Sequence, residues 1–148
     1  MKQLVIFIML IVNTNSYAEE QYKKFGHGKV VFSKQQLTIG VEVATTAMQR
    51  TIGLMFREGL AENRGMLFDY KEQAVLRVWM RNTLIPLDVV FVSSEGWVVS
   101  ILKGLQPCIK EPCEIYDSIE KARYMLEINA EIIDGNKIAI GQKVLFFM

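Results

Sequence analysis

The chain is divided into many short apolar runs, and this pattern constrains the fold more than any other feature. Over residues 37–43, apolar side chains alternate with polar residues or glycine, which is the period of a half-buried strand. Further strand-like runs, separated by turn residues, lie at residues 29–33, 66–68, 75–80, 87–92, 97–102, 122–128 and 143–147. Seven or eight short strands with one or two short helices predict an α+β domain built on a mostly antiparallel, barrel-like sheet.

The first 18 residues have the composition of a secretory signal. Lys2 precedes an apolar run at residues 4–12, and a small-x-small pattern ends at Ala18. This run is shorter than the roughly 20 residues that a membrane span needs. We therefore expect cleavage after Ala18 and a location in the periplasm or outside the cell, with no membrane span after cleavage. A flexible arm at residues 19–28 and a single β-rich domain at residues 29–148 would follow.

The charge balance argues against some classes of partner. The chain has 17 basic and 16 acidic residues, and one of the basic residues, Lys2, lies in the expected signal. A neutral mature chain gives no electrostatic reason to expect nucleic acid or an anionic membrane surface as a partner.

Two cysteines, Cys108 and Cys113, lie close together in a loop that contains two prolines. In an oxidising compartment a disulfide is the simplest interpretation, and it would fix only a local loop. A redox role is the first alternative, although the spacing is longer than Cys-x-x-Cys. A metal site is the second, but the only histidine, His27, is distant in sequence, so we expect no metal and no cofactor.

A short helix is predicted to begin at Ala47, because Thr46 and Gln49 form a Thr-x-x-Gln capping box. Three apolar residues are spaced so that they form one stripe, which we expect to face the core: Met48, Ile52 and Met55.

Another face of the same helix carries Arg50, Gly53 and Arg57. Two guanidinium groups beside a glycine are suited to hold a carboxylate or a phosphate. The alternative is an ordinary solvated helix face, with Gly53 ending the helix.

The stretch from residue 79 to residue 91 combines turn chemistry with a carboxylate. Asn82 and Thr83 favour a turn, and Pro86 restricts the backbone before the next strand. In that strand Asp88 shares a face with apolar residues, so its carboxylate must find donors or lie near water. Candidate donors are Asn82, Thr83, Arg50, Arg57 and Arg77. A role in closing the turn and a role in binding are equally compatible with this pattern.

These segments resemble a known family. The residues that carry the resemblance are Gly65-Met66-Leu67-Phe68, Trp79-Met80, Asn82-Thr83, Ile85-Pro86-Leu87-Asp88 and Phe91, followed by both cysteines, Leu126-Glu127 and Gly141. Together they are similar to domain-of-unknown-function family 192, over nearly all of the chain from about Leu37. The resemblance implies a compact, mostly β domain found in bacteria and archaea, often behind a signal peptide. It implies no activity and no catalytic residues.

Three functions are compatible with the sequence, and we rank a periplasmic binding module for a small, possibly anionic molecule first. Its expected site consists of Arg50, Arg57, Trp79, Asn82, Thr83 and Asp88, and it predicts that Asp88→Ala folds but no longer binds ligand.

A partner protein in the cell envelope is the second possibility, bound through an apolar patch that includes Phe146, Phe147 and Met148. A hydrolase with Asp88 and Glu127 as paired carboxylates is the third. No serine motif, metal-ligand cluster or usable histidine supports an enzyme. The other expectation for Glu127 is an exposed ion pair with Arg123.

Overall fold

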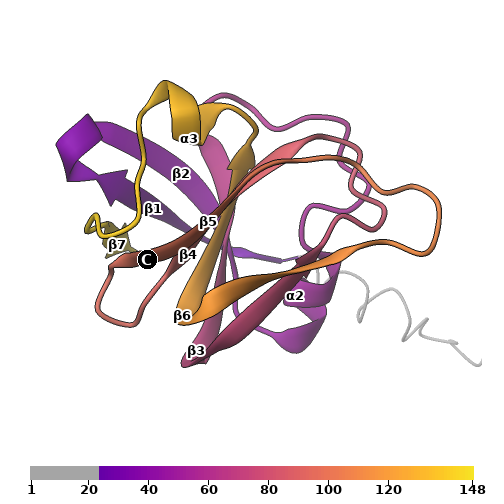
Figure 1. Ribbon diagram of the computed structural model, residues 1–148, viewed down its shortest axis with the longest axis horizontal. Helices are drawn as coiled ribbons and strands as arrows, with labels where there is room; N and C mark the ends of the chain where they lie inside the picture. The colour runs from indigo at the N-terminus through magenta and orange to yellow at the C-terminus, as the bar shows by residue number, and fades with distance from the viewer. Residues whose placement is uncertain (1–23) are drawn as a thin grey trace, which may run out of the picture.

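A computed structural model describes residues 24–148 (Figure 1). The expected signal and most of the expected arm lie outside the described residues. The elements, in order, are β1 (Gly26–Phe32), η1 (Ser33–Gln35), β2 (Leu37–Ala44), α2 (Ala47–Ile52), β3 (Arg64–Trp79), β4 (Leu87–Val92), β5 (Val98–Leu105), β6 (Ile115–Asn129), α3 (Ile132–Gly135) and β7 (Leu145–Phe147).

The strands form one sheet of seven, in the order β5-β4-β6-β3-β2-β1-β7. Only the β2–β3 pair is parallel, because the chain crosses over through α2 between these strands. This confirms the predicted α+β class and the mostly antiparallel sheet.

The sheet is not closed into a barrel. Its two edges are nevertheless tied together by backbone bonds near the turn between β4 and β5. The Val98 N–H donates to the Gln142 carbonyl at 2.8 Å, and the Val144 N–H donates to the Gly96 carbonyl at 2.9 Å. These few bonds bring the ends of the sheet together without a continuous ladder.

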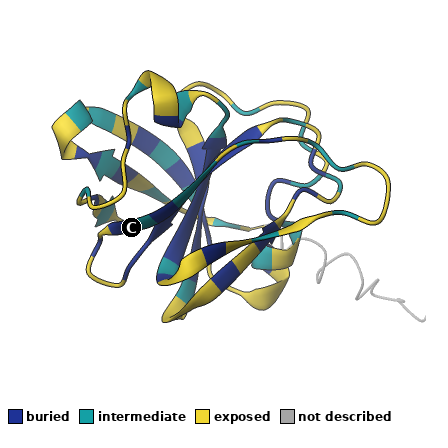
Figure 2. Cartoon of the chain, in the orientation of Figure 1, coloured by how far each residue is buried: buried dark blue, intermediate teal, exposed yellow. Residues whose placement is uncertain are grey.

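The sheet buries apolar side chains on both faces, and Figure 2 shows the buried residues concentrated where the strands cross. In β6, Tyr124, Leu126 and Ile128 belong to one cluster, whereas Met125 belongs to the other. We call these the first and the second core. The first core is covered by α3 through Ile133, and the second by Leu54, just after α2. Alternation along the central part of β6 thus directs successive side chains to opposite cores.

The long pair β3–β6 shapes the second core. Its first half lies in the middle of the sheet, and its pairing is interrupted between Asp69 and Ala74. Lys71 has a φ of 66°, and the strand bends there before pairing resumes. The bend returns Leu76 and Val78 to the second core. We expected two strands around a turn here; because the ladder continues beyond the bend, the structure has one.

Helix α2 begins where the sequence predicts. The Thr46 side chain accepts a hydrogen bond from the Gln49 N–H, and the Gln49 side-chain oxygen accepts one from the Thr46 N–H, which completes the capping box. The predicted core stripe is wrong, because Met48 is 55% exposed and Met55 lies beyond the helix. A six-residue helix covers only the rim of the second core, and Leu54 fills the interior instead.

Several boundaries differ from prediction. β1 begins at Gly26, so the last residues of the expected arm pair with β2. β6 starts at Ile115 rather than Ala122, because it pairs with the returning half of β3. Within residues 24–148, no helix is both long and apolar enough to cross a membrane.

Candidate functional site

A cavity of about 50 Å³ opens between α2 and the bent β3–β6 pair. It has room for about four water-sized positions. Fifteen residues line it, and the ones with polar, charged or aromatic side chains are Arg50, Thr51, Phe68, Tyr70, Arg77, Trp79, Arg81, Thr83 and Glu127. The cavity therefore combines apolar walls with a few polar groups, which is the usual composition of a small-ligand site.

Glu127 provides the buried acid of this cavity. On β6 it pairs with Met66 of β3 and Val89 of β4, so its side chain points into the second core. The residue is 7% exposed, and none of the residues 24–148 forms a hydrogen bond with its carboxyl group. Burial raises the pKa of Glu127 to about 8, because the charged form is poorly solvated there. At neutral pH the carboxyl is therefore mostly protonated and can donate a hydrogen bond.

Tyr70 and Arg50 form a wall beside this acid. The Arg50 guanidinium lies 4.9 Å from the centre of the Tyr70 ring, in the geometry of a cation–π contact. Burial raises the pKa of Tyr70, the nearby Glu127 raises it further, and Arg50 opposes both. Tyr70 is thus close enough to both groups to respond to their charge.

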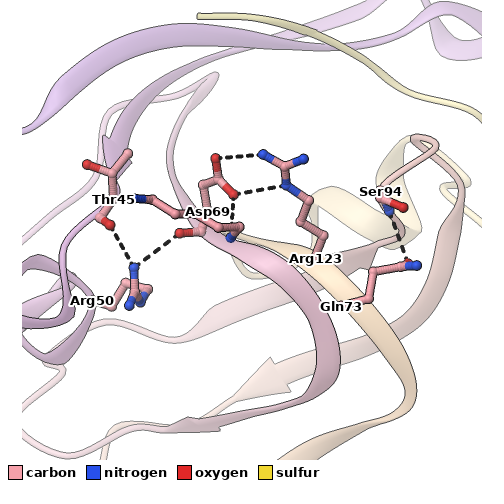
Figure 3. A network of polar contacts seen from close by, with 7 residues as sticks. Thr45, Arg50, Asp69, Gln73, Ser94 and Arg123 are labelled. Carbon is pink, nitrogen blue, oxygen red and sulfur yellow. Dashed lines mark hydrogen bonds and ion pairs between the residues drawn. The ribbon is translucent and has the colours of Figure 1, made fainter.

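A polar network fixes the bend of β3, as Figure 3 shows. Arg50 donates to the backbone carbonyls of Thr45 at 2.8 Å and Asp69 at 3.1 Å. The Asp69 carboxylate accepts bonds from Arg123 at 3.1 and 3.2 Å and from the Lys71 N–H at 2.8 Å. Burial acts to raise the pKa of Asp69, but the Arg123 and Lys71 bonds outweigh it and lower the pKa.

The expected pair of Arg123 and Glu127 is wrong. Arg123 reaches Asp69 instead, and Glu127 is buried rather than exposed. The physical reason is the bend in β3, which covers the face of β6 that a single flat strand would leave open to water.

The segment that follows α2 closes one side of the cavity. Gly53 has a φ of 47°, and a Cβ atom at this position would lie 3.1 Å from Cζ of Phe68. A side chain there would therefore combine backbone strain with a tight contact that the Phe68 ring would have to relieve. Three residues later, the Phe56 N–H donates to the Asn82 carbonyl at 2.8 Å, joining this segment to the loop before β4.

The cysteine loop supports the other side of the cavity. Cys108 and Cys113 form the predicted disulfide, with their Cα atoms 5.8 Å apart. The Cys108 N–H donates to the Met80 carbonyl at 3.0 Å, and the Cys108 carbonyl accepts from the Asn82 N–H at 3.1 Å. The disulfide loop thus holds the backbone on both sides of Arg81, which lines the cavity.

The structure brings together three of the six residues expected to bind a ligand. Arg50, Trp79 and Thr83 line the cavity. Asn82 is adjacent and contributes backbone bonds to its frame. The remaining two, Arg57 and Asp88, are engaged elsewhere.

Arg57 forms a two-point ion pair with Glu42 of β2, with one of the bonds at 2.8 Å. The hydrogen bonds from Arg57 lower the pKa of Glu42 in spite of burial. Arg57 is therefore not the donor to Asp88 that the sequence suggests.

Asp88 belongs to the first core. It pairs in the sheet with Ile128, so its side chain and that of Glu127 point to opposite faces. The Asp88 carboxylate is 1% exposed and accepts bonds from the backbone N–H groups of Gly104 at 2.8 Å and Ile133 at 2.9 Å. The two acids cannot act on one substrate group, so the paired-carboxylate arrangement is wrong.

Sequence reasoning did not identify Tyr70 as part of this site. It named Arg77 only as a candidate donor to Asp88, and Glu127 only as a partner of Asp88 or of Arg123. The available signal was a glutamate within an apolar strand that is buried on both faces. Such an acid points to a functional or structural role, because burying an unpaired carboxyl costs folding free energy. Within residues 24–148, no group of three or more His, Cys, Asp or Glu side chains could hold a metal ion.

Fold and site together define an open, mostly antiparallel β-sheet with a small cavity on one face, lined by apolar side chains and a few polar ones. The chain belongs to the DUF192 family, described as an uncharacterized ACR, which it matches over residues 29–146. A comparison with curated proteins finds no match.

Two solved structures share the fold. One is described as a candidate transcription regulator from Sinorhizobium meliloti 1021; it is 31% identical with a TM-score of 0.74, over 83% of this chain and 95% of that one. The other is a protein of unknown function from Novosphingobium aromaticivorans DSM 12444. It is 29% identical with a TM-score of 0.73, over 82% of this chain and 84% of that one.

Proposed function

We propose that this protein is a periplasmic binding domain whose cavity between α2 and the β3–β6 pair takes a small anionic molecule. The observation that carries the proposal is the position of Glu127: a carboxyl in a residue that is only 7% exposed lines the cavity and forms no hydrogen bond with residues 24–148. Because no fully shielded side-chain nitrogen or oxygen in the described residues lacks a partner, the Glu127 oxygens reach water through this opening, and a ligand can replace that water.

The charges around the cavity favour an anion. Arg50, Arg77 and Arg81 all line it, whereas Glu127, the one acid among the described residues that does so, is mostly neutral at pH 7. Glu111 forms an ion pair with Arg81 at 2.9 Å and partly neutralises it. Arg77 is exposed, and no ion pair engages it among the described residues. It is therefore the arginine best able to meet an incoming anion.

The periplasmic location is supported by the signal-like composition of residues 1–18 and by the disulfide, since disulfides persist in oxidising compartments.

The proposal is tested by two-dimensional amide NMR of the chain from Glu19, titrated separately with acetate, phosphate and methylammonium. We expect an anion to shift the amides of Gly53, Tyr70 and Thr83 in a saturable manner. Arg77→Ala should weaken this binding at least fivefold. The matched control is Arg64→Ala, which removes an exposed arginine at the other end of β3 and should leave binding unchanged.

Two results would overturn the proposal. In the first, none of the three probes shifts the cavity amides. In the second, the two arginine variants weaken anion binding equally, which would indicate a general charge effect.

A further inference from the structure

We infer that the ligand is a small carboxylic acid anion, bound so that the protonated carboxyl of Glu127 donates a hydrogen bond to the ligand carboxylate while Arg77 lies at the cavity entrance. This inference rests on the proposed function, and it adds the chemical class of the ligand and the role of one proton.

The cavity is lined by one carboxyl, that of Glu127, which has no hydrogen-bond partner among residues 24–148, and by Thr83, which is buried. The Thr83 side chain forms no hydrogen bond among residues 24–148, and its hydroxyl is not fully shielded from water, so it is also free to donate. Two donors in one cavity match the two oxygens of a carboxylate, which accepts bonds but cannot donate them.

Size agrees with this assignment. A space for about four water-sized positions has room for acetate, because its two carbons and two oxygens are bonded together and occupy less volume than four separate waters. The aromatic rings of Phe68, Tyr70 and Trp79 would surround the carbon end of such a molecule. The rest of a longer acid would have to extend through the opening toward solvent.

The charged and titratable groups around Glu127 come from several elements. Tyr70 and Arg77 lie on β3, Arg50 on α2 and Arg81 in the loop that follows β3. Glu42 of β2 and Glu127 of β6 both pair with Met66 of β3, but the charge of Glu42 is neutralised by its ion pair with Arg57. On the other side, β4 places only the apolar Val89 opposite Glu127.

Burial alone raises the pKa of Glu127, and no neighbouring cation lowers it. A second carboxylate beside Glu127 would raise this pKa further, because like charges disfavour two ionised acids at one site.

The proton balance follows directly. Below a pKa of about 8, Glu127 already carries the proton, and the ligand enters as an anion without a change in protonation. Above it, one proton must be taken from solvent for each ligand bound. Affinity is therefore expected to be nearly constant from pH 6 to pH 7 and to fall about tenfold per pH unit well above pH 8.

Titration calorimetry with acetate tests this. The Kd of the wild type should rise at least tenfold between pH 6.5 and pH 9.5. At pH 8, two buffers of different ionisation enthalpy should report uptake of about half a proton for each acetate bound. Acetamide, which has the same shape without the charge, should bind at least tenfold more weakly than acetate at pH 6.5.

Two variants separate the role of the proton from a structural role. Glu127→Gln keeps a donor at the same position, so it should bind acetate within about threefold of wild type at pH 6.5 and lose the pH dependence. Glu127→Leu removes the donor and should lose at least tenfold in affinity at pH 6.5. Because these substitutions alter a buried position, the proton-uptake measurement on the wild type tests the inference without them.

The outcomes are distinguishable. If phosphate binds at the cavity and acetate does not, the proposed function stands and this inference falls. If acetate binds with the same Kd at pH 6.5 and pH 9.5, or if methylammonium binds in preference to acetate, the proton-sharing arrangement is also wrong. If none of the probes binds, both proposals fail.

Discussion

Asp88 and Glu127 lie on neighbouring strands, point to opposite faces of one sheet, and have very different surroundings. Asp88 receives two backbone hydrogen bonds, from Gly104 on β5 and from Ile133 on α3. Glu127 receives none from residues 24–148 and faces a cavity. A buried carboxylate with two fixed donors connects three elements, so it stabilises the fold. A buried carboxyl beside an opening has no structural partner, so its position is explained better by binding.

The comparison predicts the largest effect for Asp88→Ala. Removing this acceptor leaves two backbone N–H groups unpaired, and we expect the free energy of unfolding to fall by about 4 kcal/mol. Urea denaturation measures this, with Asp88→Asn as the matched control, since the amide keeps one acceptor and should lose about half as much. If the urea midpoint of Asp88→Ala equalled that of the wild type, Asp88 would have no structural role that sets it apart from Glu127.

The second prediction concerns pH. The pKa of Glu127 is raised in the folded chain to about 8, above its value near 4.5 in the unfolded chain, so the folded state binds the extra proton between these values. Its contribution to stability is thus fully present below pH 4.5 and is lost as the pH rises toward and through 8. Between pH 5 and pH 8 we expect a loss of about 3 kcal/mol.

Urea midpoints across this range give the measurement for Glu127, and Glu127→Gln serves as the control, because it cannot titrate and should have a flatter profile. Glu42 and Asp69 act in the opposite direction, since their pKa values are lowered. Their stabilisation is lost as pH falls through the acidic range, below the window that reports on Glu127. A wild-type profile that is flat from pH 5 to pH 8 would contradict the assignment.

A smaller effect is expected from the disulfide, which supports the frame of the cavity and does not contact Asp88. Replacing Cys108 and Cys113 by serine should lower the free energy of unfolding by about 2 kcal/mol, because the closed loop is short. Amide shifts should change near Met80 and Asn82, which bond to Cys108, and not near Gly104. Equal changes on both faces of the sheet would show that the loop supports more than the cavity.

The smallest effect on stability is expected for Thr83→Val. The hydroxyl forms no bond among the described residues, so valine, which has nearly the same shape, removes no hydrogen bond, and the free energy of unfolding should change by less than about 1 kcal/mol. Anion binding should nevertheless weaken severalfold, as measured by calorimetry. A large loss of stability with intact anion binding would show that Thr83, like Asp88, stabilises the fold and does not bind the ligand.

Much of the fold was predictable because it depends on local patterns. The alternation of residues 37–43, the capping box at Thr46 and the strand at residues 87–92 all follow from neighbours in sequence. The α+β class and the disulfide also followed. The core stripe through Met48 and the two separate strands around Asp69 were wrong, because helix length and the continuation of pairing with β6 depend on distant residues.

The candidate site was predictable only in part. Arg50, Trp79 and Thr83 were identified from turn and helix chemistry, and they do line the cavity. Arg57 was assigned to a ligand, although Glu42 of β2, fifteen residues earlier, binds it. Pairing between side chains on separate elements has no local signature.

The sequence by itself determined the central part of most strands and the start of the capped helix, because backbone preferences and side-chain alternation act over a few residues. It also determined the net charge and the proximity of the two cysteines. Only the tertiary structure decided which acid faces a cavity. Asp88 and Glu127 both interrupt apolar strands and look alike in sequence, but the register of β4 against β6 directs them to opposite faces. The bend of β3 at Lys71 then encloses Glu127, while β5 and α3 supply donors to Asp88.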